Sequence, residues 1–133
     1  MREKPISEVT LRKYEPPAET LDINIRRFLL ALGLVRPGDR KSPLEAIFMA
    51  LLTASGPVTI PDMARLTEIS ESGVRYHLLR LKNLRLVAPA SRGAYSIAEG
   101  GDLVMAFKMF RKYALEDILD RISEYAVRLD EQK

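Results

Sequence analysis

The sequence contains no cysteine and no tryptophan, and it has a single histidine, His77. Without thiolates or several imidazoles, the chain cannot build a disulfide, a cysteine nucleophile or a zinc site of the usual ligand types. It also lacks an apolar run of the roughly 18 residues that crossing a membrane requires, and its N-terminal segment MREKPISEV has no apolar signal core. These absences predict a cytoplasmic protein that is neither membrane-bound nor secreted.

Side-chain amides are also scarce, since asparagine occurs only at positions 24 and 83 and glutamine only at position 132. Few thermolabile amides beside 29% charged residues form a composition typical of thermophilic proteins. The length of 133 residues and the hydrophobic content of 47%, with only 7% aromatic residues, predict one packed core of mainly aliphatic side chains.

The sequence has no glycine-rich phosphate loop and no set of serine, histidine and acidic residues beyond chance. Its densest carboxylates, Glu116, Asp117, Asp120 and Glu124, alternate with Arg121 in the manner of a solvated helix face. We therefore expect no enzymatic activity, and no residue is assigned to a cofactor or a metal.

The chain divides into an extended N-terminal arm at residues 1–18, a body at 19–100 and a long C-terminal helix at 101–133. Prolines at positions 5, 16 and 17 favour an extended arm, because proline removes backbone donors. In the body, apolar residues at helical spacing predict a first helix over 19–34, and capping residues mark the starts of three more. The predicted caps are Ser42, Thr59 and Ser70, and Asp102 is the predicted cap of the C-terminal helix.

Short apolar segments predict a small sheet. Residues 58–60 are one candidate strand, and residues 86–88 and 94–97 predict two more strands joined by the loop PASRG. The order helix, short strand, helix, turn, helix, strand, loop, strand is that of a winged helix-turn-helix. We therefore expect a mainly α fold with a small β-hairpin wing, preceded by the arm and first helix and followed by a long dimerisation helix.

The helix predicted at about 71–84 has an apolar and a polar face. Val74, Leu78 and Leu81 recur at intervals of four and three residues and should pack inward. The recognition helix of this fold reads base edges with its N-terminal residues, which must be short or able to hydrogen-bond. His77 lies beside the apolar face, and both a structural role and a phosphate contact are open for it. The residues predicted to contact DNA are Ser70, Ser72, Arg75, Tyr76, Arg80, Lys82 and, at the wing tip, Arg92.

Residues 56–97, GPVTIPDMARLTEISESGVRYHLLRLKNLRLVAPASRGAYSI, resemble the core of bacterial and archaeal winged-helix transcriptional regulators of the ArsR and MarR type. The resemblance implies this fold and binding to double-stranded DNA. Arg85 stands where that family usually has a helix-ending glycine, so we expect a strained or differently capped helix end. The thiol and histidine sensor sites of metal-responsive ArsR proteins are absent, and metalloregulation is not implied. The matching residues are Gly73 and Val74 at the helix start, His77, Leu78 and Leu81 along it, and Leu86 and Val87 at the strand entry.

The C-terminal segment carries an apolar stripe on a helix that is too long for its domain. At about 1.5 Å per residue the helix would reach roughly 40 Å, which exceeds what so small a body can cover. Pairing with a second copy would bury the stripe, and packing on the helix at 19–34 is the alternative. The residues predicted to form the dimer contact are Leu103, Phe107, Phe110, Ile118, Ile122, Tyr125 and Leu129.

Together these patterns predict a homodimeric, sequence-specific regulator of transcription that binds double-stranded DNA. An architectural chromatin-type protein is one alternative, although a net charge of +3 disfavours coating of DNA. A winged-helix module that binds a protein partner in a replication or transcription assembly is another. The sequence identifies no small-molecule or protein effector.

Overall fold

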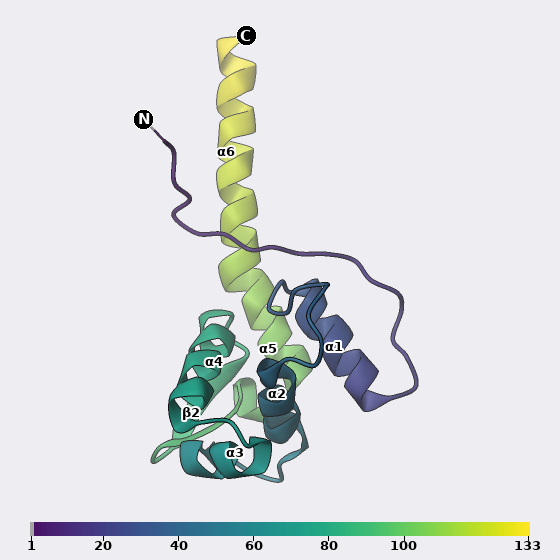
Figure 1. The fold of residues 1–133 in the computed structure, drawn as a ribbon. Coiled ribbons are helices and arrows are strands. Elements are labelled where there is room, and N and C mark those ends of the chain that lie inside the picture. Colours follow the sequence, from purple (N-terminus) through teal and green to yellow (C-terminus); the bar gives the residue numbers. More distant parts are fainter. Residues whose placement is uncertain (1) are drawn as a thin grey trace.

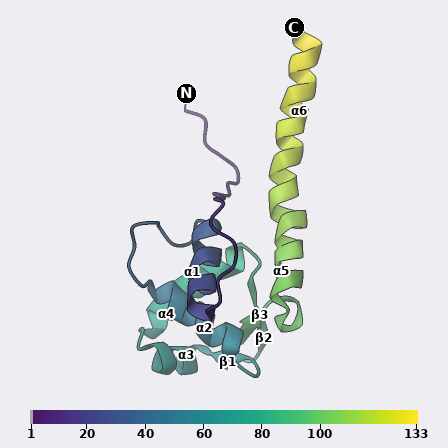
Figure 2. The ribbon, with the colours of Figure 1, turned by 90° about the vertical axis from the view of Figure 1, so that its right-hand side faces the viewer.

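The computed structural model describes residues 2–133, which are mainly helical and include one small antiparallel sheet of three strands. Four of the described helices and the sheet form a body at one end of a long helix, which projects away from that body in both views (Figures 1 and 2). Within residues 2–133, no helix combines the length and the apolar character needed to cross a membrane. The prediction of a mainly α fold with a small hairpin is confirmed.

The first two helices, α1 (Leu21–Ala31) and α2 (Pro43–Thr53), pack against each other. α1 is shorter than the predicted 19–34. It closes at Gly33, whose φ of +71° suits glycine, and the Leu34 N–H donates back to the Leu29 carbonyl at 2.9 Å. Ser42 starts α2 with a capping box, in which the Glu45 carboxylate accepts from the Ser42 N–H at 2.8 Å.

The next two helices, α3 (Ile60–Thr67) and α4 (Glu71–Asn83), are joined by three residues. Both begin at the predicted caps, because Thr59 Oγ1 accepts from the Asp62 N–H at 3.2 Å and Ser70 Oγ accepts from the Gly73 N–H at 3.1 Å. A Cβ atom on residue 73 would lie 2.9 Å from Ile69 Cγ2. Glycine at this position therefore allows the helix start to close tightly over the residues before it.

α4 ends in a reverse turn that holds Arg85 in the left-handed region, with φ at +61°. The Leu86 N–H donates to the Leu81 carbonyl at 3.0 Å and the Arg85 N–H donates to the Lys82 carbonyl at 2.8 Å. This is the Schellman pattern, which glycine normally closes. The expected strain at this helix end is confirmed, since a residue with a Cβ loses about 1–2 kcal/mol in this conformation.

The strands β1 (Val58–Thr59), β2 (Val87–Ser91) and β3 (Ala94–Ile97) form the sheet in the order β1-β3-β2. The predicted five-residue loop PASRG is wrong, because β2 continues to Ser91 and only Arg92 and Gly93 make the turn. β2 is an edge strand, and its pairing is irregular between Pro89 and Ser91. An edge position with an irregular ladder accommodates a proline that lacks a backbone donor.

The long helix consists of α5 (Leu103–Phe110), a π-helical turn η2 (Arg111–Leu115) and α6 (Glu116–Gln132). It follows the short turn η1 (Glu99–Gly101) and begins at the predicted cap, where Asp102 Oδ1 accepts from the Met105 N–H at 3.2 Å. α5 buries two residues in the core, whereas no residue of α6 is buried.

The hydrophobic core extends from the body to the base of the long helix. Phe48 and Phe110 are its largest fully buried side chains, and Val74 and Leu81 bring the inner face of α4 into it. The Phe28 ring bridges the two regions, because its centroid lies 5.6 Å from that of Phe48 and 6.5 Å from that of Phe107. The base of the long helix is therefore part of the body, and only α6 extends beyond it.

The N-terminal arm is extended, as predicted, and its second half is hydrogen-bonded to α1. The Arg12 N–H donates to the Ala31 carbonyl at 2.9 Å, and Arg27 Nη1 donates to the Pro16 carbonyl at 2.7 Å. Asn24 holds both backbone polar groups of Ala18, at 2.7 and 2.9 Å. These bonds fix the second half of the arm on the body.

Candidate nucleic-acid interface

The outer face of α4 presents a mixed polar and basic surface. Ser72, Arg75, Tyr76 and Lys82 are all exposed, and Tyr76 is 61% exposed. They lie opposite the inner face, where Val74, Leu78 and Leu81 are buried. The division of this helix into two faces follows the prediction, and four of the predicted contact residues share one accessible surface.

Three of the candidate side chains are already engaged at the start of α4. Ser70 is exposed, but its hydroxyl caps the helix and lies 3.3 Å from the Ser72 hydroxyl. Arg75 Nη2 lies 3.5 Å from Glu71 Oε1, with both side chains largely exposed. An exposed ion pair of this kind is weak, so Arg75 is able to exchange Glu71 for another acceptor.

Arg80 is not on the open face. Its guanidinium donates to the Leu34 carbonyl, 46 residues away in the chain, and lies 3.4 Å from His77 Nδ1. It also lies 5.8 Å from the centroid of the Tyr76 ring. Arg80 therefore ties α4 to the segment after α1, and the expectation of a free DNA-contacting side chain at this position is corrected.

His77 is half-buried beside Arg80 and stacks edge-on against Tyr76, with ring centroids 5.0 Å apart. Burial of the imidazole, and then the positive charge of Arg80, lower the pKa of His77 below its ordinary value of 6.5. The neutral ring is thus favoured, with Nδ1 placed to accept from Arg80. Of the two roles left open for His77, these contacts support the structural one.

Leu79 is a surface residue that sequence reasoning missed. It lies between the polar positions of the outer face and is 56% exposed. The spacing in the sequence could have predicted an outward-facing position, because Leu79 falls four residues after Arg75 and outside the inward series 74, 78 and 81. An exposed leucine in this position offers an apolar contact, such as the methyl group of thymine.

The hairpin turn carries the remaining basic candidate. Arg92 is exposed at the tip, and Gly93 follows it with φ at +63°. The tight turn places Arg92 at the end of two paired strands and not within a longer loop. The side chain is thereby presented from a more rigid support than the sequence predicted.

The predicted dimer stripe is divided by the fold. Phe110 is fully buried in the core of its own chain, so its assignment to a dimer contact is corrected. Leu103 and Phe107 are half-buried against the same core, which is the alternative packing on the first helix. Ile118 is half-exposed, whereas Ile122, Tyr125 and Leu129 are 55%, 60% and 65% exposed.

A groove runs between the beginning of the arm and this exposed stripe. Its walls are residues 3–7 on one side and Ile118, Ile122 and Tyr125 of α6 on the other. Figure 1 shows the arm crossing the line of α6 before it descends to α1. Ile6 is 93% exposed, so both sides of the groove offer apolar surface.

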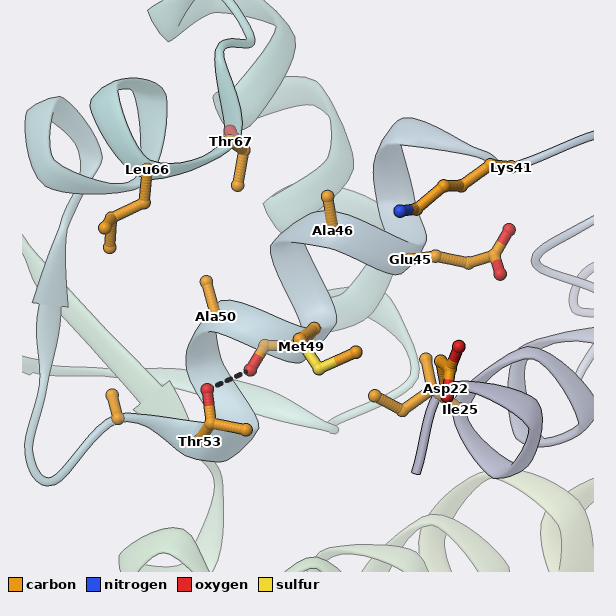
Figure 3. A pocket seen from close by; sticks show the side chains of 11 residues that line it. Asp22, Ile25, Lys41, Glu45, Ala46, Met49, Ala50, Thr53, Leu66 and Thr67 are labelled. Atoms are coloured by element: carbon orange, nitrogen blue, oxygen red, sulfur yellow. Dashed lines mark hydrogen bonds between the residues drawn. The ribbon is translucent and has the colours of Figure 1, made fainter. Parts of the chain in front are cut away.

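Two further hollows lie on the body. The one in Figure 3 lies between α1, α2 and α3, with Ala46, Met49, Ala50 and Leu66 along it, and the Glu45 carboxylate at its end is already bonded to Arg26. The other is a mainly apolar cavity of about 440 Å³ between the arm, α1, α2 and the start of α5. Its apolar lining includes Tyr14, Leu21, Phe28, Phe48, Leu52 and Leu103.

No protein-family model, curated protein or solved structure matches this chain. The resemblance of residues 56–97 to winged-helix regulators therefore remains a prediction from the sequence. Its functional interpretation depends on the surfaces described above.

Proposed function

We propose that the protein belongs to the winged helix-turn-helix class of DNA-binding proteins. Within that class, it acts as a homodimeric regulator of transcription that binds specific double-stranded sites. The observation that carries the proposal is the pair α3 and α4, joined by three residues, followed directly by a hairpin. In this class, the second helix of such a pair enters the major groove.

Base recognition falls to the first two turns of α4. Ser72 and Arg75 are exposed there, next to the 61% exposed Tyr76. The fork of an arginine matches the O6 and N7 acceptors of guanine, while serine and tyrosine hydroxyls bond to bases or phosphates. Lys82, near the other end of the helix, contacts phosphate, and so does Arg92 at the hairpin tip. Phosphate contacts make the affinity depend strongly on salt.

Dimerisation falls to α6. The same stripe on a second copy would bury its exposed apolar residues in a symmetric contact. The spacing of Ile118, Ile122, Tyr125 and Leu129 is four, three and four residues, the period of a coiled coil. A two-fold dimer presents two copies of α4 to half-sites separated by about one turn of DNA, roughly 34–36 Å.

A protein-binding module is the second candidate, and two exposed leucines favour it. Leu66 on α3 is 59% exposed and Leu79 on α4 is 56% exposed. Apolar residues in the middle of an accessible helix face are typical of protein contacts as well as of thymine contacts. This candidate would be favoured if the chain bound a protein partner and had no affinity for DNA.

Binding of the full chain to DNA duplexes tests the proposal. Fluorescence anisotropy is measured over a salt series on two duplexes, a site selected by the protein from random sequences and an unrelated sequence. Arg75→Ala should reduce the preference for the selected site by about 1–3 kcal/mol and leave binding to unrelated sequence nearly unchanged. Arg128→Ala, which removes an exposed arginine far along α6, is the matched control. Equal preference in Arg75→Ala and the wild type would contradict the role of Arg75. No binding at low salt would contradict the function, and binding without any sequence preference would favour the architectural alternative.

A further inference from the structure

Two cations meet on one aromatic ring where the end of α4 faces the long helix. The guanidinium carbon of Arg85 lies 5.2 Å from the centroid of the Tyr113 ring, and Lys112 Nζ lies 5.3 Å from it. Lys82 lines the same surface hollow as Arg85 and Tyr113. Two basic side chains from distant parts of the sequence thus lie over a single tyrosine, which is 52% exposed, and Lys82 lies beside them in the hollow. We call these four residues the Tyr113 cluster.

The basic side chains of the Tyr113 cluster form no ion pair in the described part of the chain. Among residues 2–133, no acidic group lies within 4.0 Å of the charged atoms of Lys82, Arg85 or Lys112, whereas four exposed arginines, Arg65, Arg75, Arg121 and Arg128, are each paired with an acid on their own helix. Glu99, an acid on the lining of the hollow, makes no such contact. Cations gathered in this way repel one another unless an anion joins them.

The backbone conformation of Arg85 is a second unusual feature of the Tyr113 cluster. Its φ of +61° lies in the left-handed region, where glycine is favoured and where the Schellman turn after α4 normally has one. A side chain in this position strains the native fold, and strained residues cluster at functional sites. Arg85 thus combines a strained backbone with a guanidinium held over the Tyr113 ring.

The long helix contributes through its π-helical turn. Both Lys112 and Tyr113 belong to η2, where the regular α-helical bonding is interrupted between α5 and α6. Such turns are rare and occur frequently at functional sites. Here Tyr113 faces Arg85, just after the end of α4, and Lys112 lies on the same ring.

The position of the cluster relates it to the outer face of α4. Lys82 follows Arg75 by seven residues, which is about two helical turns, so both lie on the same side of the helix. Phosphate groups flanking a groove that holds the start of α4 would pass the end of the same helix. The cluster thus continues the proposed interface toward the base of α6.

We propose that the Tyr113 cluster binds a phosphate group of the nucleic-acid backbone, with Arg85 and Lys112 as the main contacts and Lys82 beside them. A guanidinium forms paired hydrogen bonds with phosphate oxygens, and ammonium groups add charge. This inference rests on the proposed DNA-binding function and adds a contact that links the long helix to the DNA. Because it reads no base edge, the cluster changes affinity and not sequence preference.

Arg85→Gly is the decisive variant, because it removes the cation and also relieves the backbone strain. Its thermal stability should equal or exceed that of the wild type. In a double-logarithmic plot of duplex affinity against salt concentration, the slope should become shallower by about 0.9 for each phosphate group that the variant no longer neutralises, for selected and unrelated sequences alike. Lys112→Gln should give the same change, while Arg128→Gln, the matched control on α6, should not. Unchanged slopes in Arg85→Gly and Lys112→Gln would overturn the proposal, and so would a clear decrease in thermal stability of Arg85→Gly with no change in slope.

A second measurement separates this inference from the proposed function. Tripolyphosphate is titrated into the isotope-labelled full chain, and backbone amide shifts are followed by NMR. Shifts concentrated at residues 82, 85, 112 and 113, and abolished in Arg85→Gly, support the cluster even if the wild type binds no duplex, in which case only the proposed function fails. Duplex binding with unchanged slopes and no shift at these residues overturns the cluster and leaves the proposed function standing.

Discussion

The two halves of the long helix have similar apolar spacing and opposite surroundings. α5 buries Ala106 and Phe110 completely, whereas α6 buries nothing and leaves Ile122, Tyr125 and Leu129 more than half exposed. The difference lies in what is near each half, since Phe28 of α1, which stacks on Phe48 of α2, contacts Phe107 of α5, whereas no residue of α6 is buried. A periodic apolar pattern thus identifies a face that needs cover, and the tertiary fold decides whether the same chain supplies it.

The largest expected effect comes from emptying the buried half. Phe110→Ala should lower the free energy of unfolding by about 3–5 kcal/mol, because it removes a fully buried ring and leaves a cavity. Ile122→Ala, the matched change in the exposed half, should cost below about 0.5 kcal/mol at concentrations where the chain is monomeric. Chemical denaturation of both variants measures the contrast. Similar decreases in the two variants would mean that the halves do not differ as described.

A charged residue introduced into the exposed half should weaken association between copies and leave the fold of the chain unchanged. Ile122→Asp places a carboxylate in the middle of the stripe and should convert the proposed dimer to a monomer with an unchanged helical spectrum. Val127→Asp is the control, because Val127 is 60% exposed but lies on the other side of α6, five residues beyond Ile122. Sedimentation equilibrium reports the mass. A dimer that survives Ile122→Asp, or a wild-type monomer at high concentration, would contradict dimerisation through α6.

Removing an ion pair should lower stability in the body and leave it unchanged in α6. Glu45 is almost buried and accepts from both Arg26 and the Ser42 N–H, at 2.7 and 2.8 Å. Glu45→Ala leaves these donors without their acceptor and should destabilise the body by about 1–3 kcal/mol. Glu124→Ala removes the exposed partner of Arg121 on α6 and should have no measurable effect on stability. Thermal and urea unfolding of the two variants make the comparison.

The smallest expected effect is a pH dependence confined to the body. Because the folded-state pKa of His77 lies below 6.5, the unfolded chain takes up the proton first as the pH falls. The contribution of His77 to stability is thus fully present above pH 6.5 and is lost as the pH falls through 6.5 toward the folded-state pKa. His77→Gln should remove this part of the pH profile measured by urea unfolding. A profile that is identical in the variant between pH 5 and 7.5 would contradict it.

The helix starts could be predicted from the sequence because their chemistry is local. Ser42, Thr59, Ser70 and Asp102 each accept a backbone N–H within the next three residues, so a short stretch of sequence contains the whole motif. Arg85 was predictable for the same reason, since a missing glycine is visible at a helix end. The order of helices and strands followed from these boundaries.

Contacts between distant segments could not be predicted in this way. The carbonyl that holds Arg80 belongs to Leu34, and only the folded chain brings the two together. Phe110 and Tyr125 have the same pattern in the sequence, yet one is buried and the other is 60% exposed. The Tyr113 cluster joins the end of α4 to η2, and no motif spans that distance.

Selection from a pool of random-sequence duplexes by the purified full chain, at near-physiological salt, tests the central claim most directly. A homodimer that reads DNA with α4 should enrich an inverted repeat whose half-sites lie about 10 base pairs apart, and Arg75→Ala should weaken that enrichment. Recovery of no duplex, even when the selection is repeated at low salt, would contradict the account of this protein as a DNA-binding regulator.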